Sequence, residues 1–209
     1  MKQLLTFAKK PYVLFIAGLL LGALVILGVR FFSYAPEHVH YHANWAVYLN
    51  GTRDEFKAPQ YYQEVNICSA DGGITIPQQR AHMHDEINSV VHVHDHAVTW
   101  GQFFDNLGWS VTNDLIETDD GTVYRNDDTN KVNIWINGQD YTGLGSIADR
   151  VIKDEDRLLI SYGPSDQTVL TKEFASVPKT AHHYDVTKDP ASCSAGEAVT
   201  TKDRLKHLL

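Results

Sequence analysis

An uninterrupted apolar run near the amino terminus most strongly limits how this 209-residue chain can be arranged. The eighteen residues Tyr12–Val29 carry no charge. At the rise of an α-helix, a run of this length can cross the hydrocarbon core of a bilayer. We therefore predict a membrane-spanning helix over residues 12–30, preceded by a basic end at residues 1–11.

The charges that flank this run predict its orientation. Three lysines precede it and one arginine follows it, and an excess of positive charge is typical of the cytoplasmic side. We expect a single-pass protein of the cell membrane, with a cytoplasmic amino terminus and an extracytoplasmic main domain. A cleaved signal peptide would share the basic start. Its apolar core is usually shorter, however, and the small-residue segment Ser33–Ala35 is followed by Pro36, which disfavours cleavage.

Composition limits what the rest of the chain can do. Aromatic residues make up 11% and charged residues 21%, which is typical of a globular domain with its own core. The net charge is -8 and the sequence has no lysine and arginine cluster, so nucleic acid is not expected as a partner. A protein partner cannot be named from the sequence.

The two cysteines, Cys68 and Cys193, are far apart in sequence. In an oxidising extracytoplasmic compartment we expect them to form a disulfide. Two unpaired thiols, or a thiolate that binds metal, are the alternatives.

Local patterns predict several strands and one short helix. His42–Asn50 and Lys131–Gly138 are rich in strand formers, and each runs into an Asn-Gly pair, which favours a tight hairpin turn. Arg157–Tyr162 predicts a buried strand. Thr99–Gln102 matches a capping box and precedes an amphipathic helix that we expect to end near Gly108.

Together these elements predict a mainly β (α+β) fold for the extracytoplasmic domain, over residues 36–165. The domain would consist of two hairpin-containing halves, at residues 36–110 and 120–165, with short helices. From Pro164 onward polar and small residues dominate. Residues 166–209 are therefore expected to form a loosely structured polar tail with one strand at most.

Eight of the eleven histidines alternate with other residues in three short clusters. Side chains two apart on a strand share a face, so alternating imidazoles can point toward one centre, and imidazole is the commonest protein ligand for borderline metals. The first-choice ligands, for one ion or divided between two, are His40, His42, His82, His84, His92 and His94. His38 and His96, at the ends of their clusters, are further candidates.

Two of these clusters fall on segments that predict neighbouring antiparallel strands. A loop with an odd number of residues would place His84 opposite His92 and His82 opposite His94, about 5 Å apart at Cβ. A loop with an even number would place Met83 opposite His92 and separate the two sets.

The neighbouring aspartates and the expected disulfide determine which other donors are available to the ion and which metal is expected. Asp85 and Asp95 adjoin candidate ligands, so each can coordinate an ion or accept the second ring N–H of a histidine. If the cysteines are paired, the soft sulfur donors that select Cu(I) are missing, since Met83 is the only methionine besides Met1. A copper or zinc ion is therefore expected, with copper slightly favoured by the Irving–Williams order and nickel or iron behind.

The predicted function is metal binding, for capture, buffering or delivery at the membrane surface. A metalloenzyme, either a copper oxidoreductase or a zinc hydrolase, is the alternative, although no residue stands out as catalytic. A structural surface module is the second alternative. In that case the histidines would form a solvated face of strands whose Val91 and Val93 face the core. A pH sensor built from protonating imidazoles is a further interpretation.

The order of motifs also carries a resemblance. HVHYHANWAVYLNG, then HMHD, then VHVH followed by TWGQFFDNLGW, is similar to a set of uncharacterised, membrane-anchored bacterial and archaeal proteins. Those proteins have a His-x-His strand, a His-Thr-His-Asp-like segment, an Ile-His-Val-like strand and a Leu-Gly-x-Phe-Phe helix. The resemblance covers roughly His38–Trp109 and the strand Leu159–Gly163. It implies a reusable metal-binding module and no particular reaction.

Overall fold

The computed structural model describes residues 10–34, 39–63, 76–186, 201–206 and 208. These residues belong to two compact units, one formed by Met1–Glu37 with Ala198–Leu209 and the other by His38–Glu197. The predicted disulfide between Cys68 and Cys193 lies outside the described residues, as does His38.

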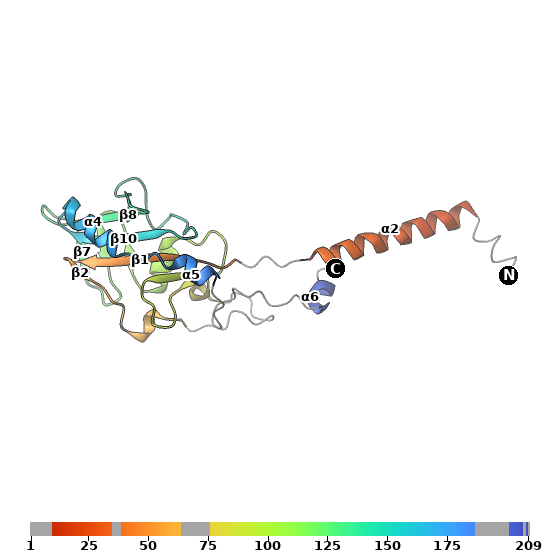
Figure 1. Cartoon of the computed structure of the whole chain (residues 1–209), viewed down its shortest axis with the longest axis horizontal. Coiled ribbons are helices and arrows are strands. Elements are labelled where there is room, and N and C mark those ends of the chain that lie inside the picture. The colour runs from red at the N-terminus through yellow and green to blue at the C-terminus, as the bar shows by residue number, and fades with distance from the viewer. Residues whose placement is uncertain (1–9, 35–38, 64–75, 187–200, 207, 209) are drawn as a thin grey trace. The chain divides into compact units, whose positions relative to one another are not determined.

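The first unit contains the apolar helix α2, which spans Pro11–Ser33 (Figure 1). Its large apolar side chains are exposed, and the helix is long and apolar enough to cross a bilayer. A signal sequence near an amino terminus shares this length and composition. The short helix α6, Thr201–Lys206, adjoins its end, where Arg204 Nη1 donates to the carbonyl oxygens of Phe31 at 2.7 Å and Phe32 at 3.1 Å. These bonds satisfy carbonyl groups that a helix end leaves unpaired.

The second unit is built on a seven-stranded sheet with the order β3-β4-β1-β10-β8-β9, in which β2 also pairs with β1. The strands are β1 Tyr41–Leu49, β2 Thr52–Arg53, β3 Ala81–His82, β4 Val90–Val93, β8 Lys131–Ile136, β9 Gln139–Asp140 and β10 Arg157–Gly163. The central strands β1 and β10 run parallel, and all other neighbours are antiparallel.

Smaller elements complete this unit. A three-stranded sheet contains β5 Ser110–Val111, β6 Leu115–Glu117 and β7 Val123–Arg125. The helices are α3 Trp100–Asn106, α4 Gln167–Ser176 and α5 Ala181–Val186, with 3₁₀ turns η1 Pro59–Tyr61 and η2 Pro77–Gln79. The described part of the chain is thus α+β and β-rich apart from α2, as the sequence predicts.

Both predicted hairpins are present, β1 with β2 and β8 with β9. The turn residues Asn50, Gly51, Asn137 and Gly138 all have positive φ, at 53°, 77°, 53° and 82°. Asn and Gly tolerate this conformation best, which explains why Asn-Gly occurs at both turns. The predicted capping box of α3 is also present, because the Thr99 side chain accepts from the Gln102 amide.

The two hairpins do not form separate halves. They belong to one continuous sheet, because β1 pairs with β10 along six residue pairs from Asn44↔Arg157 to Leu49↔Tyr162. One face of this sheet forms the main core with α3, and includes Trp45, Val91 and Val93. Alternation along the same strands directs His42, Asn44 and His92 to the opposite face.

That opposite face is covered by α4 and α5, which corrects the expectation of a loosely structured tail after residue 165. Leu170, Phe174, Val177 and Ala181 recur at helical spacing, and all four are buried or half-buried. The polar composition of the segment obscured this pattern. In Figure 1, α5 lies beside the start of β1.

Candidate metal centre

Three adjacent strands bring imidazoles together on the α5 side of the sheet. His42 on β1 is the direct partner of His92 on β4, and His92 is the partner of His82 on β3. These three residues therefore form one row across the sheet. The shared face that the alternating histidines predict is confirmed for this row.

The pairing register differs in detail from the prediction. His82, and not His84, lies opposite His92, so the pairing is displaced by two residues from that expected for an odd loop. A displacement of two keeps the same side chains on the same face. The chain turns first at Asp85–Glu86, where the Ile87 amide donates to the His84 carbonyl at 3.0 Å, and again at residues 88–89, where the sequence predicts the turn.

The turn at Asp85–Glu86 has two consecutive residues with positive φ, at 53° and 56°. A glutamate in this conformation is strained, since its Cβ crowds the backbone. The turn brings the side chain of His84 back over the row, so that its ring centroid lies 3.7 Å from that of His92. The strained turn thus adds a fourth imidazole.

Two further imidazoles extend the group. The ring of His94 stacks between those of His40 and His82, at centroid distances of 4.6 Å and 5.0 Å and interplanar angles of 18° and 8°. We call the six residues the imidazole cluster. It consists of His40, His42, His82, His84, His92 and His94.

Three rings of the imidazole cluster are held at Nδ1 by an oxygen atom. Carboxylate and carbonyl oxygens only accept hydrogen bonds, so each Nδ1 carries the proton and each neutral ring presents a lone pair at Nε2. The pairs are His42 with Asp185 Oδ1 at 2.5 Å, His84 with Asp85 Oδ2 at 2.7 Å, and His82 with the Gln78 carbonyl at 3.1 Å.

The lone pairs of two of these rings meet a third ring. His42 Nε2 lies 2.8 Å and His84 Nε2 lies 3.0 Å from the same atom, Nδ1 of His92. A metal-to-nitrogen bond of about 2.0–2.1 Å places two ligands of a tetrahedral ion about 3.3 Å apart. Each of these two pairs therefore approaches the separation of two ligands of one ion. The three residues whose donor atoms all lie within 4.8 Å of one another are His40, His42 and His92.

Burial favours the neutral form of three of these imidazoles. Five of the six residues are buried, and His42 and His92 have no exposed surface. Burial first, and neighbouring imidazoles second, lower the pKa of His82 to about 4 and that of His94 to about 2, and hold the pKa of His92 well below its ordinary value. Neutral imidazole is the form that binds metal. The interpretation of these histidines as a solvated strand face is wrong, although Val91 and Val93 do face the core.

The other predicted ligands have different positions. Asp95 binds Arg80, whose Nε donates to Oδ2 at 2.8 Å, and it also accepts from the His96 amide at 2.7 Å. His96 is exposed. Asp85 is oriented toward a ring nitrogen of His84, which fits the second of the two roles expected for it.

The prediction missed the contribution of α5. Asp185 binds His42, and the ring of Tyr184 lies 5.8 Å from that of His42 and 6.0 Å from that of His92. A signal was present in the sequence, because two further histidines, at positions 182 and 183, directly precede Tyr184 and Asp185. The polar composition of the segment predicts a loose tail and so hides this signal.

Two polar side chains of the sheet hold this helical region in place. Asn44 Oδ1 accepts from the amides of Thr180 and Ala181, both at 2.9 Å, where α5 begins. Arg157 donates to the carbonyl oxygens of Phe174 at 3.1 Å, Pro178 at 3.0 Å and Val177. The helix that carries Asp185 is therefore fixed over the imidazole cluster by buried hydrogen bonds.

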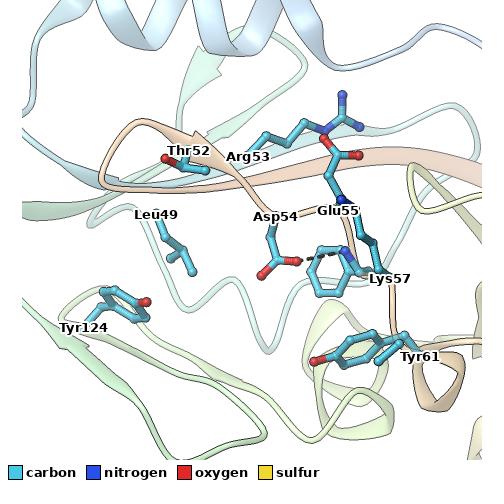
Figure 2. A pocket seen from close by; sticks show the side chains of 10 residues that line it. Leu49, Thr52, Arg53, Asp54, Glu55, Lys57, Tyr61 and Tyr124 are labelled. Atoms are coloured by element: carbon cyan, nitrogen blue, oxygen red, sulfur yellow. Dashed lines mark hydrogen bonds between the residues drawn. The ribbon is translucent and has the colours of Figure 1, made fainter.

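A separate groove of about 550 Å³ lies near the β1–β2 hairpin and η1 (Figure 2). Its charged residues are of both signs, and Tyr61 and Tyr124 contribute aromatic rings. Burial, followed by the hydrogen bond to Asp119, raises the pKa of Tyr61 to about 12, so its phenol stays protonated. The described residues that line the groove include no histidine, so it is distinct from the imidazole cluster.

Comparison with known proteins finds no family model, no curated protein and no solved structure that matches this chain. The resemblance to uncharacterised membrane-anchored proteins stays a prediction. The function is therefore argued from the geometry of the site.

Proposed function

We propose that the imidazole cluster binds a transition-metal ion, either Cu(II) or Zn(II), and that the protein holds this ion at a membrane surface for capture, buffering or delivery. The observation that carries the proposal is the approach of His42 Nε2 and His84 Nε2 to His92 Nδ1, at 2.8 Å and 3.0 Å. Each of the first two nitrogens has its lone pair directed inward, because its own Nδ1 is engaged by a carboxylate.

A cation explains this geometry better than a proton does. One proton on His92 Nδ1 can form a well-aligned bond to only one of the two facing lone pairs, whereas a cation can accept the lone pairs of His92 and of a neighbouring ring together. Carboxylates that accept the distal N–H of a ligating histidine are the usual partners of such sites, since they fix the tautomer and increase ligand basicity. Asp185 and Asp85 supply two such contacts.

The number of imidazoles supports one primary ion and leaves donors for a second. A single zinc or copper ion takes three to five ligands, and the cluster has six. Donor atoms of His40, His42 and His92 all lie within 4.8 Å of one another, and His84 adds a donor 3.0 Å from His92 Nδ1. His82 and His94, whose rings stack on each other, are the remaining donors, and buried His92 Nε2 has no hydrogen-bond partner within the described part of the chain.

The donor set favours borderline metals. All six candidates are imidazole nitrogens, which suit Cu(II) and Zn(II), and copper binds more tightly by the Irving–Williams order. A metalloenzyme would need an open coordination position for its substrate. Five of the six rings are buried, so the imidazole cluster is better suited to hold an ion than to bind and convert a substrate.

The membrane role depends on α2. Its length, its exposed apolar side chains and the excess of positive charge before it support an uncleaved anchor with the main domain outside the cytoplasm. Labelling of cysteines introduced on either side of the helix in intact cells tests this orientation. Protection of a cysteine in the main domain from an impermeant reagent would contradict it.

Metal analysis of the purified full-length chain in detergent tests the central proposal. After chelation and reloading, we expect at least one equivalent of Cu(II) or Zn(II) per chain by elemental mass spectrometry. His84→Gln with His92→Gln should lose this equivalent and its thermal stabilisation, which amounts to about 2.7 kcal/mol at a free ion concentration of 100 times Kd. The matched control His96→Gln with His183→Gln, at two exposed positions, should keep both.

Absence of stoichiometric metal from the reloaded wild-type protein would contradict the proposal. Equal binding by the two double variants would contradict the assignment of the ligands. Circular dichroism in the presence of chelator separates loss of ligands from loss of fold.

A further inference from the structure

A second group of candidate metal ligands joins two residues of α5 to one residue of the turn before β10. The group contains one donor atom from each of three residues, Glu155, His182 and Asp185. These three atoms all lie within 4.8 Å of one another. The closest pair is His182 Nδ1 and Glu155 Oε1, at 3.0 Å. Unlike the imidazole cluster, this group is open to solvent, since the side chains of His182 and Glu155 are 68% and 56% exposed.

The positions of these residues are set by contacts with β1. The Glu155 amide donates to the His42 carbonyl at 2.8 Å, and Glu155 has a positive φ of 58° in the turn before β10. On the other side, α5 is held at its start by Asn44. The carboxylate and the imidazole therefore approach each other from two elements that are each fixed to the same strand.

Asp185 connects this group to the imidazole cluster. Its Oδ1 accepts from His42 Nδ1 at 2.5 Å. Its other oxygen, Oδ2, is buried and has no hydrogen-bond partner among the described residues. A buried carboxylate oxygen of this kind is costly unless it finds a donor or a cation.

Negative charge is concentrated around this oxygen. Asp185 is repelled by the neighbouring carboxylate of Glu155, and the attraction of His182 offsets part of that repulsion. A divalent cation would offset this repulsion more fully than a single imidazole does.

We propose that Glu155, His182 and Asp185 form a second divalent-cation site, which is open to solvent and shares Asp185 with the imidazole cluster. One nitrogen and two carboxylate oxygens suit Zn²⁺ and similar borderline ions, and water completes the coordination. With three protein ligands, two of them on exposed side chains, this site binds more weakly than the imidazole cluster. Its existence is independent of the proposed function, and only the coupling through Asp185 rests on that function.

Zinc titration of the full-length chain in detergent tests the second site. The wild-type protein should show a tight class and a weaker class of bound Zn²⁺ in equilibrium dialysis with elemental analysis. Glu155→Gln with His182→Gln should weaken the second class at least tenfold and keep the tight class. The control Glu117→Gln with His183→Gln makes the same chemical changes at exposed positions and should keep both classes.

The variant Asp185→Asn tests whether Asp185 contributes to both metal sites. It should weaken both classes, by about 10-fold or more for the tight class, as expected for loss of a carboxylate that supports a ligand. A weaker class that persists unchanged in Glu155→Gln with His182→Gln, or in Asp185→Asn, would overturn the second site.

The two proposals fail in different ways. Loss of the tight class from the wild-type protein would refute the proposed function. In that case a weaker class that is lost only in Glu155→Gln with His182→Gln would still support the second site.

Discussion

Asp185 Oδ1 lies 2.5 Å from Nδ1 of His42, although the two residues are 143 positions apart in the sequence. The contact joins a helix near the carboxyl end of the domain to the strand that begins it. His42 is fully buried and the Asp185 side chain is 19% exposed, so the bond lies at the boundary between the imidazole cluster and solvent. It fixes which nitrogen of His42 can bind a metal.

Asp185→Asn should therefore weaken binding at the imidazole cluster without unfolding the domain. The amide keeps the shape of the side chain but is a weaker acceptor, so the affinity for Cu(II) or Zn(II) should fall about 10-fold to 100-fold. Competition with a chromophoric chelator measures this change. The control Asp128→Asn, at an exposed turn, should bind as the wild type does, and an equal loss in both variants would contradict a specific role for Asp185.

Stability of the metal-free protein should fall on acidification. The pKa of His82 is lowered to about 4 in the folded state, chiefly by burial, so the unfolded state takes up a proton first as the pH falls below about 6.5. Proton uptake by the unfolded chain favours unfolding, and this loss of stability accumulates between about pH 6.5 and 4. Urea unfolding with chelator at pH 8, 6 and 5 measures it.

A matched variant isolates the source of that pH dependence. His82→Gln removes a group that titrates differently in the two states, so its stability should change less between pH 8 and pH 5 than that of the wild type. Replacement of the exposed His96 by Gln should leave the dependence unchanged. Identical profiles for wild type and His82→Gln would contradict the explanation.

Asn44→Ala should release α5. The side chain is 1% exposed, and it accepts from two amides and donates to the Ser89 carbonyl at 3.1 Å and to Thr180 Oγ1 at 3.0 Å. Loss of these buried bonds should lower the free energy of unfolding by on the order of 2–3 kcal/mol. Hydrogen exchange should show faster exchange in residues 180–186 than in β8. A uniform increase throughout the domain would contradict a local anchoring role. Gln139→Ala, at an exposed site, is the control.

Glu86→Gly should stabilise the metal-free protein. Glu86 has a φ of 56°, a conformation in which glycine avoids the clash of Cβ with the backbone. We expect the free energy of unfolding to rise by about 0.5–1 kcal/mol, measured by urea unfolding. Glu117→Gly, in the strand β6, should have the opposite sign. A destabilised Glu86→Gly protein would show that the glutamate side chain itself supports the turn.

Much of the imidazole cluster could be predicted from local periodicity. Alternation places His42 and His92 on one face, and Val91 and Val93 on the other, wherever these segments form strands. The Asn-Gly turns and the capping box of α3 are equally local, because they depend on the conformations of a few consecutive residues. The exact pairing of residues between β3 and β4 could not be predicted in this way. It depends on which residues form the turns between the strands, and the chain turns at Asp85–Glu86.

The spacing of neighbouring residues is enough to specify the apolar helix, the two hairpins and the shared face of the alternating histidines. The packing of distant segments, in contrast, places α5 over this face and Asp185 against His42. The same packing buries five of the six histidines of the imidazole cluster. Contacts between residues more than a hundred positions apart depend on how the strands and helices pack, and no local pattern in either segment specifies its partner.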